Sequence, residues 1–197
     1  MILSGGKAPY AVLDTMRWRT PRNIVENMAA RLGIEKFDLD AAGEVGAKHA
    51  SRVITAEQNC LTTEWDFPGV EHVFFNPPWA RKGITKAARQ ATTQTSPLAV
   101  TYPFPGTQAF VLRAAEQSRR HKLTVAALLP SSLDHWMKQC LQLADEVWFG
   151  PRIRFLALDG QLGPSPPGPH LVAVYRPHTP LSGHPGGPRV TWDWRPV

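Results

Sequence analysis

Residues 70–79 read VEHVFFNPPW, an apolar run that passes directly into an amide, two prolines and an aromatic ring. The run predicts a buried strand over residues 70–75. Because Pro77 and Pro78 have no backbone N–H to donate, the strand must end at Asn76. In an open α/β sheet, side chains that follow a strand lie at the carboxyl edge, where such folds bind ligands. The stretch therefore predicts a binding site as well as a strand.

Short apolar strand candidates alternate with amphipathic helix candidates on both sides of this stretch, which predicts a three-layer α/β sandwich with a mostly parallel sheet. One helix is expected after Thr20, which can cap it, with Pro21 in the first helical position and Gly33 at its end. Apolar residues recur between them at helical spacing, at Ile24, Val25, Met28, Ala29 and Leu32. The other expected elements are strands at residues 37–41, 53–54, 98–102, 123–129 and 146–149, and helices at residues 45–50, 84–93, 108–120 and 133–144. Residues 152–158 and 171–175 are expected to complete the sheet as its antiparallel end.

The composition is that of a basic globular domain. The 197 residues are 43% apolar, and 22 Lys and Arg against 16 Asp and Glu give a net charge of +6. This excess favours an anionic partner such as nucleic acid. Cys60 and Cys140 stand far apart with no Cys/His cluster, so neither a disulfide scaffold nor a metal site is expected. No apolar run reaches about 18 residues, so we expect a cytoplasmic protein that does not span a membrane.

Glycine and proline are concentrated in the C-terminal part of the chain, which holds much of the total of 15 Gly and 19 Pro. We expect residues 177–197 to form a Pro/Gly-rich tail. Its apolar stretch at residues 190–194 either adds an edge strand or packs its tryptophans on the body, and without such packing the tail is expected to be mobile.

The polar loop after the strand at residues 70–75 suits an exocyclic amine. The Asn76 amide oxygen and the Pro77 carbonyl can each accept one hydrogen of an NH2 group, and Trp79 can stack on the ring that carries this group. The prolines hold both acceptors without reorganisation. With both N–H bonds taken, the amine lone pair is directed at an electrophile, which suits methyl transfer to nitrogen. The alternative interpretation is an ordinary turn after a strand.

Residues 38–43, DLDAAG, supply a second candidate site at the end of the first expected strand. A carboxylate from Asp38 or Asp40 can hold the ammonium group of an amino acid. The small residues from Ala41 onward let a ligand approach the backbone near a helix N-terminus. This describes the methionine end of S-adenosylmethionine. The alternative is that Asp40 caps a helix and Asp38 is solvated.

Six segments, in this order, resemble the phage DNA N6-adenine methyltransferases of the Dam family over about residues 17–175. They are Trp18-Arg19-Thr20-Pro21, Phe37-Asp38-Leu39-Asp40-Ala41-Ala42, Asn59-Cys60-Leu61 with Trp65, Asn76-Pro77-Pro78-Trp79, Leu128-Leu129-Pro130 and Gly150-Pro151-Arg152-Ile153-Arg154-Phe155. The combination carries the resemblance, because each piece alone is common.

The resemblance implies a class I S-adenosylmethionine-dependent methyltransferase fold, which is Rossmann-like, over residues 17–176, after an N-terminal extension at residues 1–16. It also implies a set of cofactor-binding residues, namely Trp18, Thr20, Pro21, Asp38, Asp40, Ala41, Glu57 and Asn59. Asn59 is expected near the adenosine and Glu57 near the ribose hydroxyls, although residue type alone equally fits solvated loop positions.

The chain departs from the family pattern in its cofactor loop, which has no Gly-x-Gly, and at Trp79, where Tyr or Phe is commoner. The long spacing from Trp79 to Leu128 indicates that residues 80–108 are either a substrate-recognition insertion or extra packing, and Pro151 is an added residue. Four basic residues in this segment are candidates for contacts with DNA phosphates, namely Arg81, Lys82, Lys86 and Arg89. The alternative for them, and for a second basic cluster at residues 119–122, is a solvated helix face.

We therefore expect an enzyme that methylates the N6 amine of adenine in double-stranded DNA after swinging the base out of the duplex. Base flipping costs a few kcal/mol, and stacking on Trp79 returns about 1–3 kcal/mol. The expected catalytic residues are Asn76, Pro77, Pro78 and Trp79. A phage-encoded enzyme of this kind acts in the cytoplasm of the bacterial host. The alternatives are methylation of RNA adenine or of a protein glutamine, and a catalytically silent nucleic-acid-binding module on the same scaffold.

Overall fold

The computed structural model describes residues 19–79, 106–131, 135–157, 160–163, 168–177 and 189–192. Several expectations from the sequence lie outside these ranges. They are Trp18, the helix at residues 84–93, the strand at residues 98–102, and the candidate phosphate contacts Arg81, Lys82, Lys86 and Arg89.

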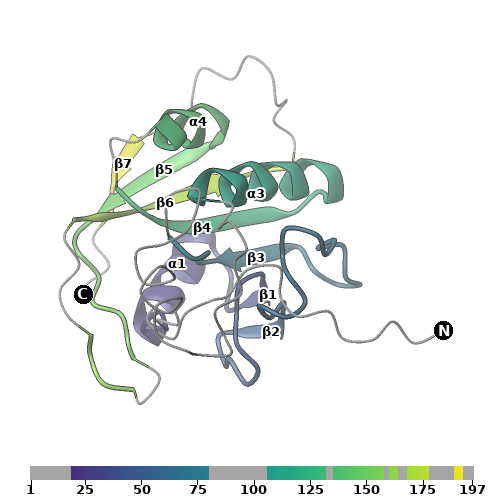
Figure 1. Ribbon diagram of the computed structural model, residues 1–197, viewed down its shortest axis with the longest axis horizontal. Coiled ribbons are helices and arrows are strands. Elements are labelled where there is room, and N and C mark those ends of the chain that lie inside the picture. Colours follow the sequence, from purple (N-terminus) through teal and green to yellow (C-terminus); the bar gives the residue numbers. More distant parts are fainter. Residues whose placement is uncertain are drawn as a thin grey trace, which may run out of the picture.

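Within the described residues, seven strands form one sheet (Figure 1). The strands are β1 (Phe37–Asp40), β2 (Ala50–Val53), β3 (His72–Phe75), β4 (Thr124–Pro130), β5 (Glu146–Gly150), β6 (His170–Tyr175) and β7 (Arg189–Thr191). Their order is β2-β1-β3-β4-β6-β5-β7, and only β6 is antiparallel to its neighbours. The expected mostly parallel sheet is confirmed. The antiparallel part expected toward the C-terminus is also confirmed, in β6, which lies between β4 and β5 and runs antiparallel to both.

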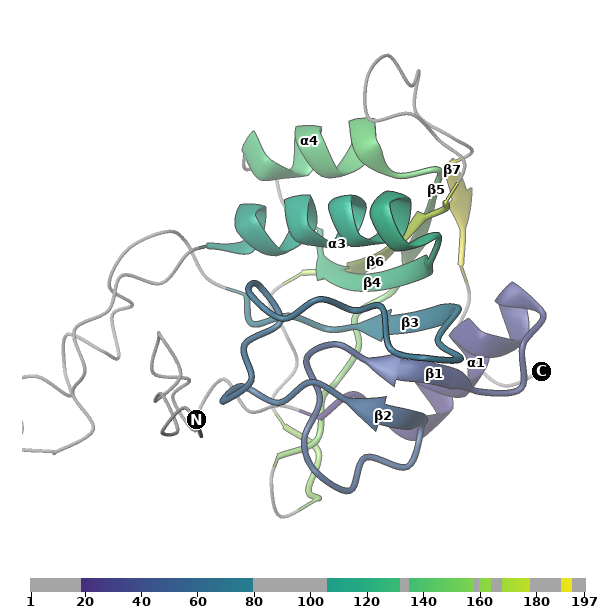
Figure 2. The ribbon, with the colours of Figure 1, turned by 90° about the vertical axis from the view of Figure 1, so that its right-hand side faces the viewer.

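Helices cover both faces of the sheet, which confirms the expected three layers (Figure 2). Helix α1 (Arg22–Leu32) packs on one face, and α3 (Thr107–His121) and α4 (His135–Leu143) pack on the other. Alternate residues of β4 point to opposite faces, so that Val125 and Ala127 pack with α3 and α4. Ala126 and Leu128 pack with α1. This alternation is the period of two expected for a strand that is buried on both faces.

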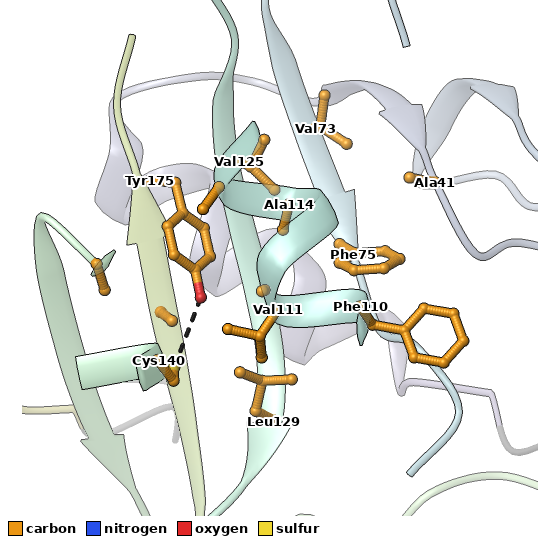
Figure 3. Close-up of a cluster of buried hydrophobic side chains, with 14 of the residues drawn as sticks. Ala41, Val73, Phe75, Phe110, Val111, Ala114, Val125, Leu129, Cys140 and Tyr175 are labelled. Carbon is orange, nitrogen blue, oxygen red and sulfur yellow. Dashed lines mark hydrogen bonds between the residues drawn. The ribbon is translucent and has the colours of Figure 1, made fainter. Parts of the chain in front are cut away.

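The core on the side of α3 and α4 is closely filled with aliphatic and aromatic side chains (Figure 3). In it, the hydroxyl of Tyr175 lies 3.5 Å from the Sγ of Cys140, at hydrogen-bond distance. Complete burial raises the pKa of Tyr175 well above its usual value. Both cysteines are buried as free thiols.

Helix α1 matches the predicted apolar spacing, and it ends at Gly33, whose φ of 75° is left-handed. Its start differs from the expectation. Pro21 is the residue before the helix and not its first helical residue, and its carbonyl accepts the N–H of Ile24 at 3.0 Å. Thr20 makes no capping bond to the helix, because its hydroxyl is used elsewhere.

Two expected elements are wrong. Residues 45–50 form turns and not a helix, with Gly46 at a φ of 87°, and strand β2 already begins at Ala50. Residues 152–157 are not a strand of the sheet. In this segment Leu156 makes isolated bridges to Arg19 and Leu162. In both places long-range pairing decides the backbone conformation over local pattern.

The C-terminal segment adds an edge strand and packs a tryptophan, the two outcomes that residues 190–194 suggest. Strand β7 pairs with β5, and Trp192 is 1% exposed between the sheet and α1. Its Nε1 donates to Asn27 Oδ1 at 2.6 Å. Gly150 leaves the space that the indole fills, because a Cβ there would lie 2.8 Å from Trp192 Cε3.

No helix in the described part of the chain is long and apolar enough to cross a membrane.

Candidate active site

Several of the predicted site residues that the structure describes, Asp40 and Asn76 among them, lie at the carboxyl edge of the sheet. Strand β1 lies between β2 and β3, so the connection that leaves β1 toward β2 and the connection that leaves β3 toward β4 diverge at this edge. Such a switch point is where open α/β sheets bind ligands. Asp40 is the last residue of β1 and pairs with Phe74, two residues before Asn76. The loops after β1 and β3 therefore lie side by side.

Asn76 is held by a residue far away in the sequence. Its Nδ2 donates to Thr20 Oγ1 at 2.9 Å, across 56 residues of chain. Its other amide atom, Oδ1, is buried and accepts no hydrogen bond from the described residues. Buried polar groups are nearly always paired in folded proteins. The free oxygen therefore marks the place where a hydrogen-bond donor is missing.

The segment around Thr20 is fixed by the segment that follows β5. Arg19 and Leu156 exchange two backbone hydrogen bonds, each of 2.8 Å. This bridge brings Phe155 over the loop of Asn76, where its ring lies 5.0 Å from that of Trp79. The segments around Thr20 and Phe155, which both belong to the family resemblance, thus meet the loop of Asn76 and Trp79 at the edge of the sheet.

Trp79 is partly buried and packs against two rings. Its indole lies edge-on to Phe155 at an interplanar angle of 79°, and 5.1 Å from the ring of His170 at an angle of 40°. Its Nε1 is buried and finds no acceptor among the residues that the structure describes. The expected stacking of Trp79 on a base stays a prediction.

His170 packs against both Trp79 and Phe155, and the sequence pattern does not single it out. It is the first residue of β6, opposite both Pro130 and Gly150, and only 1% exposed. Its Nδ1 accepts the backbone N–H of Ile153 at 3.1 Å, and burial lowers its pKa to about 4. His170 is therefore neutral at neutral pH and carries its proton on Nε2. A single histidine before an apolar strand does not indicate a site by itself. Its position beside Trp79 depends on the pairing of β6 with β4 and β5.

The loop after β1 is built around Asp40, whose side chain is almost fully buried. One carboxylate oxygen accepts the Ala42 N–H at 3.0 Å, and the other lies 2.8 Å from His49 Nε2. Gly43 passes so close that a Cβ would lie 2.7 Å from the same oxygen. Asp40 thus caps the turn that follows the strand. Ala41 and Gly43 add little or no side chain to the backbone of this turn.

Asp38 lies apart from this edge. Its Oδ2 accepts the backbone N–H groups of Glu71 and His72, at 3.0 and 2.9 Å, where β3 begins. The two carboxylates expected to share a role are thus separated. Asp38 joins β1 to the start of β3, and only Asp40 lies at the site.

The turn after β2 brings the remaining cofactor candidates to the same edge. Asn59 is 5% exposed with a left-handed φ of 58°, and its Oδ1 accepts the N–H of Leu61 at 3.2 Å. Asparagine tolerates this conformation better than most residues. Glu57 is exposed on the same turn.

The second basic cluster, residues 119–122, serves the fold. Arg119 donates to the Leu143 carbonyl at 2.7 Å, and burial lowers its pKa. Arg120 and His121 lie 3.3 and 2.7 Å from the carboxylate of Glu64. This end of α3 leads into the start of β4, at the edge of the sheet opposite Asn76. No group of three or more metal-ligating side chains is found in the described ranges.

Comparison with known proteins identifies a family whose sequences match this chain. A sequence model of the family described as DNA N-6-adenine-methyltransferase (Dam) matches residues 7–178. A DNA N-6-adenine-methyltransferase of Haemophilus phage HP1 (strain HP1c1) is 26% identical over 171 residues, covering 85% of this chain and 82% of the relative. One of Escherichia phage T1 is 38% identical over 80 residues, which cover 41% of this chain but only 31% of the relative.

Two solved structures also match. One is a putative class I S-adenosylmethionine-dependent methyltransferase from Listeria monocytogenes, with a TM-score of 0.48, 12% identity, and coverage of 93% of this chain and 68% of that one. The other is the methyltransferase subunit of a type I restriction-modification system from Streptococcus thermophilus, with a TM-score of 0.44, 14% identity, and coverage of 87% and 47%.

The family match spans most of the chain and all the segments that meet at the site, from the Thr20 segment to β6. With the sheet order above, it confirms the expected class I fold, whose methyl donor is S-adenosylmethionine. This chain belongs to the DNA N-6-adenine-methyltransferase (Dam) family.

Proposed function

We propose that this chain methylates the N6 amine of adenine in double-stranded DNA and that Asn76 and Pro77 hold the amine. One observation carries the proposal, which is the buried Asn76 Oδ1 that accepts no hydrogen bond within the described residues. An unpaired buried acceptor costs about 1–3 kcal/mol. An amine N–H that enters the site removes this cost, so the free oxygen favours a ligand that donates.

The chemistry follows from how the amine is held. Asn76 Oδ1 accepts one N–H and the Pro77 carbonyl accepts the other, while Pro78 keeps the loop rigid. The nitrogen lone pair is then directed away from both acceptors, toward the methyl group. The proton that the nitrogen loses after transfer passes to water, so the scheme needs no general base. Thr20 acts as a positioning residue, because it occupies Nδ2 and leaves Oδ1 to the amine.

The ends of β1 and β2 fit the cofactor of the family. A carboxylate oxygen has two lone pairs, so Asp40 can accept from an ammonium group while it keeps its bonds to Ala42 and His49. Glycine at position 43 leaves the Asp40 carboxylate in place, because a Cβ there would lie 2.7 Å from its oxygen. When bound, S-adenosylmethionine supplies the electrophilic methyl group. Around it we place Pro21, Asp40, Ala41, Glu57 and Asn59.

The proposed partner is duplex DNA, from which the adenine is flipped into the site. The net charge of +6 favours this polyanion. We propose Arg81, Lys82, Lys86 and Arg89 as phosphate contacts, because they follow directly on the loop that ends at Trp79. Both relatives above are phage proteins, so we also propose that the chain acts inside a bacterial cell.

The proposal is tested by expressing the chain in bacteria that lack endogenous adenine methylation. Their DNA is digested to nucleosides and analysed by mass spectrometry, with RNA and protein glutamine analysed in parallel. We expect N6-methyldeoxyadenosine in DNA only, and none with Asn76→Ala. Methyl groups found only in RNA or protein overturn the choice of substrate. If the chain binds S-adenosylmethionine but labels none of the three, it is a silent module.

A further inference from the structure

We propose that Arg152 and Arg154, on the segment that follows β5, bind phosphates of the DNA strand that carries the target adenine, next to the flipped nucleotide. The inference rests on the proposed function and deepens it, because it names protein groups that hold the DNA backbone while the base enters the site. The phosphate contacts that the sequence predicts all lie elsewhere, within residues 81–89.

The segment that carries both arginines, residues 151–156, crosses the carboxyl edge of the sheet. It leaves the end of β5, which runs in the same direction as β4 because β6 is antiparallel to both. It then reaches Arg19, which exchanges two backbone hydrogen bonds of 2.8 Å with Leu156. The segment thus extends from β5 to the residue before Thr20, whose hydroxyl holds Asn76.

The inward-facing residues of the segment fix its position beside the loop that follows β3. Ile153 and Phe155 are 1% and 7% exposed, and both pack in the core on the side of α1. The backbone N–H of Ile153 donates to His170 Nδ1 at 3.1 Å. The ring of Phe155 lies 5.0 Å from that of Trp79. The segment is therefore held both by the sheet and by the loop that carries Asn76.

Arg152 and Arg154 alternate with these two buried residues and are exposed. Residues two apart in an extended segment share one face, so both arginines lie on the outer side. An extended segment rises about 3.3 Å per residue, which places such a pair about 6.6 Å apart. This separation is close to that of successive phosphates along one DNA strand. Two cations on a fixed backbone therefore suit a row of evenly spaced anions.

Neither guanidinium is neutralised within the fold. Arg152 forms no ion pair, hydrogen bond or ring contact within the described ranges. Arg154 donates only its Nε, to the Gly163 carbonyl at 3.0 Å. The other arginines whose side chains the structure describes are all engaged, with glutamate carboxylates, aromatic rings or backbone carbonyls. The two arginines beside the site thus differ from the rest in having charge available for a partner.

The chemistry of the guanidinium selects the kind of partner. Its N–H groups form a planar fork that matches two oxygens of a phosphate. In Arg154 the bond at Nε fixes the side chain and leaves both terminal amino groups to form such a fork. DNA presents a phosphate on each side of every nucleotide, and contacts to phosphates set the position of a protein on the duplex. Holding the phosphates beside the target keeps the backbone in place while the base rotates out.

The salt dependence of DNA binding tests the inference, because a lost phosphate contact changes it and a purely structural role does not. Binding of a fluorescently labelled duplex is measured by anisotropy from about 50 to 200 mM salt, where the logarithm of the binding constant falls with a slope of about 0.9 per contacted phosphate. The test variant is Arg152→Gln with Arg154→Gln. Arg120→Gln with Arg176→Gln is the matched control, since it removes the same charge from exposed arginines that pair with glutamates at the opposite edge of the sheet.

The test variant should have a salt slope smaller by about 2 and should bind roughly 10- to 100-fold more weakly at 0.1 M salt. The control should keep the slope of the parent. Arg152→Lys with Arg154→Lys retains both charges and should keep most of the slope. Arg152→Gln alone should lower the slope by about 1. It removes a side chain without a contact to any described residue, so it serves even if the double variant does not fold.

Neutral phosphates test whether the contacts flank the target. The methylated sequence is first found by sequencing DNA from the expressing bacteria. Duplexes are then made with a methylphosphonate in place of one phosphate at a time on either side of the target adenine. Single-turnover methylation by the parent should fall by roughly tenfold at a contacted position, which is one phosphate contact at 0.1 M salt. The variant with both Gln substitutions should be insensitive at the same position.

Three results overturn the inference. The first is an unchanged salt slope in the Gln variants, and the second is an equal loss of slope in the control. The third is a methylphosphonate effect that is the same in the parent and in the test variant. If the parent methylates ordinary duplexes in these cases, the proposed function stands and only this inference fails. A parent that binds no duplex at any salt concentration overturns the proposed partner as well.

Discussion

Asn76 Nδ2 donates a hydrogen bond to Thr20 Oγ1 at 2.9 Å, which joins the loop after β3 to the residue that precedes Pro21 and α1. The bond occupies the amide nitrogen of Asn76, whereas the amide oxygen has no hydrogen-bond partner among the described residues. It also explains why α1 begins without a side-chain cap. The hydroxyl that local sequence assigns to the helix instead accepts a hydrogen bond from Asn76.

Replacing Thr20 by Val should lower kcat by about 10- to 100-fold, because the Asn76 amide loses the partner that orients it. Thr20→Ser keeps the hydroxyl and should restore most of the rate. The affinity for S-adenosylmethionine, measured by calorimetry, should change little in either variant. If Thr20→Val weakens cofactor binding and leaves kcat unchanged, Thr20 is a cofactor contact and not a positioning residue.

Asn76→Ala should reduce methyl transfer by at least about 100-fold, the usual effect of removing one preorganised group that contacts the reacting atoms. Cofactor affinity should stay within a few-fold of the parent. Asn76→Asp offers an oxygen on both positions, so Thr20 can donate to one while the amine donates to the other, and it should retain more activity than Asn76→Ala. Near-normal turnover by Asn76→Ala contradicts the site.

The two carboxylates of β1 should respond differently to removal. Asp40→Ala should weaken S-adenosylmethionine binding roughly 10- to 100-fold, the worth of one charge-assisted hydrogen bond. Asp38→Ala should leave this affinity unchanged and instead lower the free energy of unfolding by about 1–3 kcal/mol, since two backbone N–H groups lose their acceptor.

Calorimetric titration and urea unfolding of both variants separate these effects. Gly43→Ala offers a further check, because its Cβ would displace the Asp40 carboxylate, whereas the nearest atom to a Cβ at Gly168 is 3.8 Å away. Gly43→Ala should therefore bind the cofactor weakly and Gly168→Ala normally. Parent-like affinity in Asp40→Ala would move the cofactor site elsewhere.

Glu64 should make stability depend on acid pH. Hydrogen bonds, first from Gln117 and then from His121, lower its pKa from 4.5 to about 2. A carboxylate with a lowered pKa stabilises the folded state fully above 4.5, and this contribution is lost as the pH falls from 4.5 toward 2. Glu64→Gln should flatten the pH dependence of the urea midpoint over this window. Glu26→Gln, an exposed carboxylate outside this network, is the control. An unchanged slope in Glu64→Gln contradicts the assignment.

The elements that the sequence predicts well are those with a local cause. Helix α1 follows from apolar spacing that ends at a glycine, and β3 from an apolar run cut off by Pro77 and Pro78. The helix expected at residues 45–50 fails because Ala50 pairs with Phe37 of β1. The strand expected at residues 152–158 fails because Leu156 pairs with Arg19. Neither partner can be read from the segment itself.

The residues of the candidate site likewise fall into those that the local sequence predicts and those that it does not. Asn76, its prolines and Trp79 stand out because amide, prolines and ring are adjacent in the sequence. Thr20 and His170 carry no such local mark. The hydroxyl of Thr20 reaches Asn76 across 56 residues, and His170 reaches Trp79 through the pairing of β6 with β4 and β5. The separation of Asp38 from Asp40 likewise depends on where β3 begins, beside β1.

The hydrogen bond from Trp192 to Asn27 spans 165 residues, and it has a consequence for synthesis. When α1 leaves the ribosome, neither β7 nor the indole that covers its Asn27 has yet been made. The part of α1 that Trp192 covers and the outer edge of β5 therefore stay uncovered until β7 is translated, and long-range closure of this kind slows folding. During that interval the nascent chain is most exposed to aggregation and to proteases, so chaperones that hold it at this stage should influence how much enzyme a cell obtains.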